Sequence, residues 1–231
     1  MITVGVFGDS FGYEGSIFGD KSITYDSAGE SWVSLLRNHV KITNYCEPGS
    51  DLYFSYKNFI SNYKKFDKNI FLVTNFNRFS FKFKDKFIHA HSYDSASVQI
   101  KKCTNEKQKA LKASMDYFLY LQDDEKDSIL RNLYLNDMIL KNSNTSFIKC
   151  FGENSLNEIM QKENQSWNLP SRYTFKEKFI DIRESHLTKE NNKLLYNKVL
   201  KWLIKDIKIE IDTDDFVAPS LDKKETYILK L

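Results

Sequence analysis

The first residues that could carry chemistry follow a short apolar run near the start of the chain. Residues 4–7 read as a buried central strand, and Gly8, Asp9 and Ser10 then change its character at once. A turn here would present the Ser10 hydroxyl at the carboxyl end of the strand, the edge where open α/β sheets bind ligands. Glycine, aspartate and serine are also the commonest residues of ordinary turns. The pattern therefore indicates a candidate nucleophile, with a turn of no catalytic role as the alternative.

A histidine far along the chain could supply the base that a serine nucleophile needs. His186 shortly precedes residues 189–205, whose apolar side chains repeat at helical spacing. A base that accepts the hydroxyl proton activates a serine, and a carboxylate then orients the imidazole and stabilises its cation. Asp181 and Glu184 are the available carboxylates, and we favour Asp181 because it follows an apolar pair. These residue types predict acyl transfer, although a lone histidine in a loop is more often structural.

The order of these residues resembles that of the SGNH/GDSL hydrolases, a family of serine esterases and lipases. The resemblance rests on the strand that runs into Gly-Asp-Ser at residues 8–10, on Trp32 at the start of the next helix, and on His186 before the last helix. It implies that Ser10 and His186 are catalytic. The family normally has Asp-x-x-His, whereas Arg183 stands three residues before the histidine here.

The resemblance also implies an oxyanion hole built at three strand ends. Its donors would be the backbone N–H groups of Ser10 and Gly49 and the side-chain amide of Asn75. The third family block reads Gly-x-Asn-Asp, but a valine and a phenylalanine stand at its first and last positions here, and Asn77 is a rival for the amide. Taken singly, Gly49 is explained equally well by a turn that needs glycine.

Three polar side chains beside these positions are candidate substrate contacts, namely Asp9, Asn77 and Arg78. A solvated surface charge is the alternative for the arginine. His89 and His91 lie two residues apart and would share one face of a strand, but no nearby carboxylate or cysteine completes a ligand set. We therefore predict neither a metal site nor a cofactor.

The elements that must position these residues alternate between strands and helices. The apolar pattern predicts strands at residues 2–7, 40–45, 69–74 and 145–151. It also predicts one helix that starts near residue 30, a second that ends near residue 63 and a third over residues 189–205. The polar segment up to residue 170 reads as irregular or weakly helical. The resemblance implies an α/β fold, a three-layer α/β/α sandwich with a mainly parallel, flavodoxin-like sheet.

Two further segments complete the predicted organisation. Residues 79–104 carry a Phe- and Lys-rich alternation, seen best at 79–83, that indicates an exposed strand with one apolar face. Residues 105–141 have the pattern of a helical-hairpin insertion. We expect residues 1–208 to form the hydrolase-like domain. Residues 209–231 would form a C-terminal extension packed on the domain or on a neighbouring subunit of a homo-oligomer.

Composition restricts the partners and the compartment. The chain has 34 basic and 31 acidic residues in 231, so its charge gives no case for binding nucleic acid. No signal peptide or membrane-spanning run is found, and three scattered cysteines are typical of free thiols, so we expect a cytoplasmic protein. The Lys- and Asn-rich composition and residues 184–188 resemble viral members of the family more than secreted ones, which would mean the host cytoplasm.

The predicted function is hydrolysis of a carboxylic ester through an acyl-enzyme, with a small-molecule or O-acetylated carbohydrate ester as substrate. The alternative is a catalytically silent module of the same fold that binds a glycan or a protein partner. A nucleotide-binding flavodoxin-like protein is a third interpretation, but the first turn lacks the glycine spacing of a phosphate-binding motif.

Overall fold

The computed structural model describes part of the chain and defines its central sheet. The described residues are 1–14, 31–74, 78–83, 86–90, 105–106, 109–110, 112–113, 144–149, 166–168, 187, 189–207 and 209–217. Within them, five strands pair in parallel in the order β2-β1-β3-β6-β7. These strands are β1 (Thr3–Gly8), β2 (Lys41–Cys46), β3 (Lys68–Val73), β6 (Thr145–Lys149) and β7 (Ser166–Asn168).

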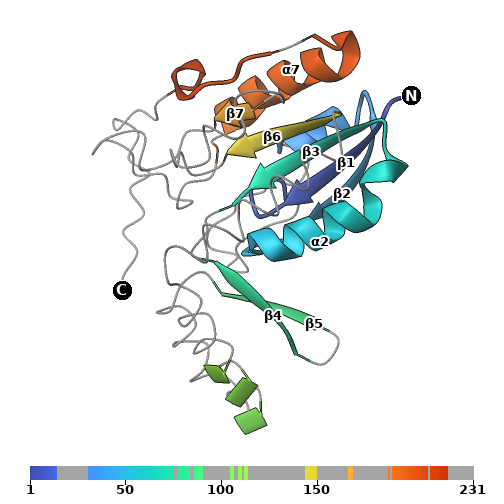
Figure 1. Cartoon of the computed structure of the whole chain (residues 1–231). Helices are drawn as coiled ribbons and strands as arrows, with labels where there is room; N and C mark the ends of the chain where they lie inside the picture. Colours follow the sequence, from blue (N-terminus) through green and yellow to red (C-terminus); the bar gives the residue numbers. More distant parts are fainter. Residues whose placement is uncertain are drawn as a thin grey trace.

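This strand order confirms the predicted flavodoxin-like sheet. Counted along the chain, the strands of the sheet lie in the order 2-1-3-4-5. The direction of winding reverses between β1 and β3, which lie side by side in the middle of the sheet (Figure 1). Ligands of such sheets bind beyond the carboxyl ends of the two strands at that reversal. Ser10, two residues after β1, is at this edge.

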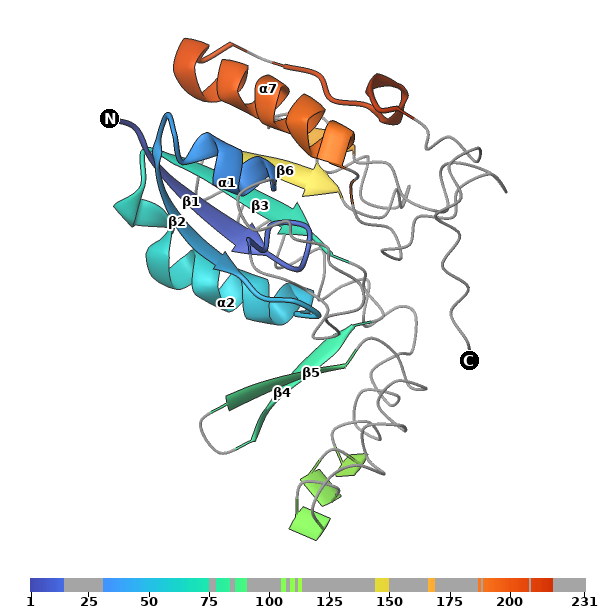
Figure 2. The ribbon, with the colours of Figure 1, turned by 180° about the vertical axis from the view of Figure 1, so that it is seen from behind.

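Helices cover both faces of the sheet and give the predicted three layers. Helices α1 and α7 lie on one face and α2 lies on the other, as the two opposite views show (Figures 1 and 2). The helices are α1 (Trp32–Leu36), α2 (Leu52–Asn62) and α7 (Lys189–Lys205), with the short 3-10 turns η1 (Tyr63–Lys65) and η3 (Thr213–Asp215). The helix predicted at 189–205 is confirmed with the same bounds.

The alternation of side chains along β1 and β3 builds two separate hydrophobic cores. Val4 and Val6 of β1 belong to the cluster on the α1 and α7 side, whereas Phe7 belongs to the cluster on the α2 side. In β3, Leu72 and Phe71 divide in the same way. Because helices cover both faces of the sheet, β1 and β3 each contain a continuous apolar run in the sequence.

A second, two-stranded sheet lies beyond α2 on the side away from α7 (Figure 1). It is the antiparallel pair β4 (Phe79–Phe83) and β5 (Lys86–Ala90), so the strand structure predicted within residues 79–104 is confirmed for these two segments. Asp51 ties it to α2. One oxygen of that carboxylate accepts from the Phe54 N–H and caps the helix, while the other accepts from the Ser80 N–H at 2.6 Å.

One sequence-based interpretation is wrong. The segment up to residue 170 was expected to be irregular or weakly helical, but Ser166–Asn168 is the edge strand β7. It pairs with β6 through Phe147 opposite Ser166. A strand of only three residues is too short to show an alternating pattern in the sequence, and it forms because β6 is available to pair with it.

Two predicted segments lie largely outside the described residues. Of the hairpin predicted at 105–141, six residues are described, and all six are helical. The hairpin therefore stays a prediction, as does the domain boundary near residue 208. In the described part of the C-terminal segment, Ile211 and Phe216 are buried in the cluster of α1 and α7, and Asp215 pairs with Lys198 of α7 at 2.7 Å.

None of the helices in the described ranges is long and apolar enough to cross a membrane. Those same ranges hold no cluster of three histidine, cysteine, aspartate or glutamate side chains that could bind a metal ion. His89 lies in β5 opposite Ser80, and His91 is outside the described residues.

Candidate active site

A tight turn directly after β1 fixes the position of Ser10. The Gly12 N–H donates to the Asp9 carbonyl at 3.1 Å, and the Tyr13 N–H donates to the Ser10 carbonyl at 3.3 Å. The turn begins at Gly8, whose φ is +151° and where an added Cβ would lie 2.5 Å from the Cβ of Leu72. Only glycine meets both conditions. The strand end and the serine that follows it are therefore set by close packing of β1 on β3.

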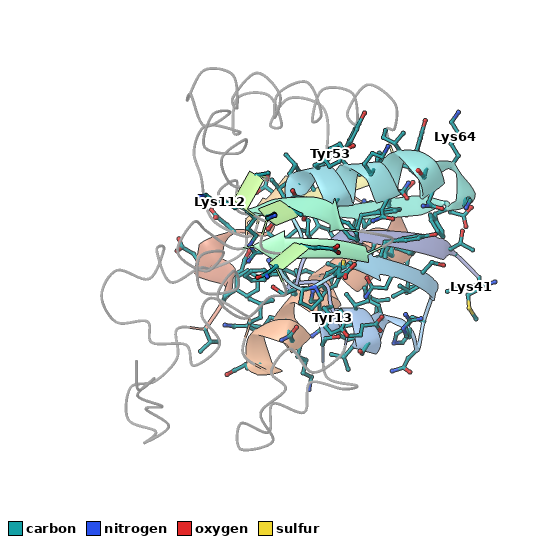
Figure 3. All side chains as sticks on the ribbon, turned by 90° about the horizontal axis from the view of Figure 1, so that it is seen from below. Tyr13, Lys41, Tyr53, Lys64 and Lys112 are labelled. Carbon is teal, nitrogen blue, oxygen red and sulfur yellow. The ribbon has the colours of Figure 1, made fainter. Side chains whose placement is uncertain are left out.

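The chain after this turn runs to the α1 side of the sheet. Tyr13 lies on the opposite side from Tyr53 of α2 and Lys64 of η1 (Figure 3). Phe11 is 5% exposed and belongs to the α1 and α7 cluster. Ser10 itself is 6% exposed, so the residue lies at the margin of the core.

A buried ion pair joins the end of β1 to the end of β3. Asp9 has no exposed surface, and its Oδ2 accepts from Thr74 Oγ1 at 2.7 Å and from Arg78 Nη1 at 2.5 Å. Its Oδ1 accepts from the Phe11 N–H at 3.1 Å. The Arg78 side chain is 9% exposed and also donates to the Thr74 hydroxyl at 2.8 Å. This network therefore clamps the two strand ends at the point where the sheet reverses its winding.

The loop after β2 is attached to the same strand end. The Glu47 N–H donates to the Gly8 carbonyl at 3.1 Å, and Ser50 Oγ donates to the same oxygen at 3.0 Å. Between them, Gly49 has a φ of +77°, a conformation that glycine adopts without strain. The Gly49 backbone is thus held against the end of β1, on a loop bonded twice to the strand that presents Ser10.

The structure brings four of the predicted site residues to one edge of the sheet, namely Asp9, Ser10, Gly49 and Arg78. The others, Asn75, Asn77, Asp181, Glu184 and His186, lie outside the described residues. Leu187, which follows His186 in the chain, is described and is 4% exposed. It belongs to the same hydrophobic cluster as Phe11, which follows Ser10.

Sequence reasoning missed two sets of contacts around the site. Asp9 and Arg78 were separate candidate substrate contacts, whereas the structure pairs them with each other and with Thr74. The only signal was a polar residue at the end of a buried strand. The second set joins the first turn of α7 to distant parts of the chain. The Asn191 side chain bonds the backbone of Val217, and the Asn192 side chain bonds the backbone of Trp32 and of Leu187.

A second charged cluster fixes the chain beyond the turn. Glu14 accepts two hydrogen bonds from the Arg37 guanidinium, at 2.6 and 2.7 Å, and one from Asn44 Nδ2 at 3.0 Å. Burial on its own would raise the pKa of the Glu14 carboxyl, but the hydrogen bonds from Arg37 and Asn44 outweigh it and hold the pKa below its ordinary value.

The lowered pKa of Glu14 predicts a pH dependence of stability. Because the folded state favours the charged carboxylate, its contribution is complete above the ordinary pKa of 4.5 and is lost as the pH falls through the lower folded value. Below about pH 4.5 we expect the free energy of unfolding to fall more for wild type than for Glu14→Gln. The difference between the two proteins should stay below about 1 kcal/mol, because Arg37 is half exposed and solvent screens the pair. Urea unfolding of both proteins from pH 7 to pH 3 measures this difference, and parallel curves would contradict it.

The one described cysteine near the site serves packing. Cys46 is a free, buried thiol, and an added Cβ on Gly12 would lie 2.4 Å from its sulfur. Burial, together with the charges of Asp9 and Glu14, raises the pKa of this thiol well above its ordinary value. A thiol held protonated is a poor nucleophile, so Ser10 remains the candidate nucleophile at this edge.

No protein-family profile and no curated protein matches the chain. Similar solved structures include a lipase/acylhydrolase from Enterococcus faecalis, with 12% identity, a TM-score of 0.48 and coverage of 90% of this chain and 98% of that chain. A member of the lipolytic G-D-S-L family from Veillonella parvula DSM 2008 has 12% identity, a TM-score of 0.46 and coverage of 90% and 100%. A psychrotrophic esterase from Pseudoalteromonas sp. has 11% identity, a TM-score of 0.45 and coverage of 88% and 99%. At these values the likeness assigns no activity to this chain.

Proposed function

We propose that the protein is a serine hydrolase that cleaves carboxylic esters through an acyl-enzyme on Ser10. One observation carries the proposal. Ser10 follows the strand at which the sheet reverses its winding, and the Gly49 loop is bonded to the same strand end through Glu47 and Ser50. The Gly8 carbonyl oxygen therefore links two parts of the proposed site. It belongs to the strand that presents Ser10, and it holds the loop whose backbone could bind an oxyanion.

The reaction would proceed in two displacements. Ser10 Oγ attacks the ester carbonyl carbon while His186 accepts its proton, and His186 then protonates the departing alcohol. A water molecule then attacks the acyl-enzyme while His186 accepts its proton, and His186 returns that proton to Ser10 Oγ as the acid departs. Asp181, or Glu184 in its place, would hold the imidazole in the required tautomer.

The tetrahedral intermediates would be stabilised by the N–H groups of Ser10 and Gly49 and by the side-chain amide of Asn75, with Asn77 as its rival. Each such donor is typically worth about 100- to 1000-fold in rate. The rigid attachment of the Gly49 loop to Gly8 supports this role, because preorganised donors need no rearrangement during the reaction.

We assign Asp9 and Arg78 to positioning, in place of the substrate contact first considered. The Asp9 carboxylate has no exposed surface, and it bonds the Phe11 N–H within the turn that carries Ser10. Its second oxygen holds Thr74 and Arg78, at the end of the strand that precedes Asn75. The pair would therefore align the nucleophile with the proposed amide donor, and Asn77 stays the candidate contact with substrate.

The test measures hydrolysis of p-nitrophenyl acetate and p-nitrophenyl butyrate by wild type and by Ser10→Ala at equal protein concentration. Turnover by wild type that is lost in the variant is the expected result, because no other group replaces the nucleophile. The relative rates of the two esters then give the acyl length. O-Acetylated sugars and small-molecule acetates are the two substrate classes to compare next.

A catalytically silent module that binds a glycan or a protein is the second candidate, and the low exposure of Ser10, at 6%, favours it. Equal and negligible hydrolysis by wild type and Ser10→Ala would select this candidate and contradict the hydrolase.

A further inference from the structure

We propose that Trp32 and Asn192 form a buried bridge that positions His186 against Ser10, which makes both of them positioning residues for the reaction. The inference rests on the proposed function and deepens it. The bridge starts at Phe11, one residue after Ser10, and ends at Leu187, one residue after His186. Figure 2 shows the two helices that carry it, α1 and α7, lying beside each other over the sheet.

The first half of the bridge joins α1 to the nucleophile turn. Trp32 Nε1 donates to the Phe11 carbonyl at 2.8 Å, and Trp32 has no exposed surface. Trp32 is the first residue of α1, and the preceding Ser31 caps the helix by accepting from the Ser34 N–H. An indole has a single hydrogen-bond donor, so this bond fixes where the rigid ring and the turn meet.

The second half joins α1 to the residue after His186. The Trp32 backbone N–H donates to Asn192 Oδ1 at 3.0 Å, and Asn192 Nδ2 donates to the Leu187 carbonyl at 3.0 Å. A backbone N–H in the first turn of a helix has no partner within that helix, and Asn192 supplies one. Asn192 is 8% exposed and Leu187 is 4% exposed.

The Asn192 side chain links the two ends of the bridge. Its planar amide holds the acceptor for the Trp32 N–H and the donor to the Leu187 carbonyl in one plane, so the positions of Trp32 and Leu187 are coupled. Water does not compete strongly for the bonds, since all four residues are buried. The positions on the two sides of the proposed Ser10 and His186 contact are thus set by three hydrogen bonds, two at 3.0 Å and one at 2.8 Å.

The neighbouring Asn191 provides a matched control. It is 1% exposed, and its amide also makes two hydrogen bonds, to the carbonyl and to the N–H of Val217. Those bonds lead to the C-terminal segment and not toward Ser10. Asn191→Ala and Asn192→Ala therefore remove equivalent bonds from adjacent residues of one helix.

The test measures hydrolysis of p-nitrophenyl acetate, the rate at which an alkyl fluorophosphonate labels Ser10, and Tm. Both alanine variants should lower Tm by a similar few degrees. Asn192→Ala should lower kcat about 10- to 100-fold, slow the labelling to a similar extent and leave KM within about threefold. Asn191→Ala should change kcat and labelling by less than about twofold, within the ordinary scatter of a remote substitution.

Trp32→Phe is the second variant, since it retains an aromatic ring and removes the indole donor together with part of the ring volume; the Tm measurement reports the packing loss. It should also lower kcat, and combining it with Asn192→Ala should cost no more than the larger single effect, because both break one bridge. Equal kcat and labelling rates in the Asn191 and Asn192 variants would overturn the inference while leaving the hydrolase intact. Absence of labelling at Ser10 in wild type would instead contradict the proposed function, and the inference with it.

Discussion

Replacing His186 by alanine is expected to lower kcat by about 10⁴-fold or more while leaving the protein folded. Without the imidazole, no group accepts the Ser10 proton during attack, and no group protonates the departing alcohol. The effect should appear in kcat and in kcat/KM alike, because the base acts in the transition state. Steady-state hydrolysis of p-nitrophenyl acetate by purified wild type and variant measures it.

His39→Ala is the control for the loss of a histidine elsewhere in the chain. His39 lies just after α1, and its ring nitrogen bonds the Tyr196 hydroxyl at 2.8 Å in an exposed pair. That variant should retain activity close to wild type. The double variant Ser10→Ala/His186→Ala should be no slower than either single variant, because the two residues act as one unit. Activity of His186→Ala near that of wild type would remove His186 from the mechanism.

Asp9→Ala is expected to lower the free energy of unfolding by about 3–5 kcal/mol, the usual cost of removing one partner of a buried ion pair. The Arg78 side chain is 9% exposed and would lose the carboxylate that neutralises it. Thr74 would lose its acceptor, and the turn would lose the bond to the Phe11 N–H. Urea unfolding, with the midpoint and slope fitted together, gives the change.

An exposed ion pair in the same protein provides the comparison. Asp206 pairs with Lys68, but its side chain is 76% exposed, so Asp206→Asn should cost less than about 1 kcal/mol. Asparagine tolerates the positive φ of that position, so the substitution adds little backbone strain. Asp9→Ala no more destabilising than Asp206→Asn would show that the buried pair does not clamp the strand ends.

The sheet could be predicted because its signal is local. β1 and β3 are apolar on both faces, and each is followed at once by polar or turn residues, so their limits are visible in the sequence. The 17-residue helix α7 keeps one apolar stripe over its whole length, which is why its predicted bounds match. β7 has three residues and depends on β6 for its pairing, so no local pattern marks it.

The site could be predicted only as far as each residue acts at its own strand end. Ser10 and Gly49 follow recognisable strands, and the order of the strands brings their loops together. The contacts of Asp9 and of Asn192 could not be predicted in this way, because each joins residues far apart in the sequence. Arg78 is 69 residues from Asp9, and Trp32 is 160 residues from Asn192, so neither contact leaves a trace in spacing. Such pairs follow from the packed structure alone.

The most direct test of the central claim is the covalent intermediate itself. Wild-type protein is mixed with p-nitrophenyl acetate, quenched in acid within the first turnover and digested with trypsin, which releases residues 1–21 as one peptide. The good leaving group makes acylation fast, so the acyl-enzyme accumulates. We expect one acetyl group on that peptide, located at Ser10 by fragmentation and absent from Ser10→Ala. Turnover without any acetyl group at Ser10, or with the acetyl group on another residue, would contradict the account.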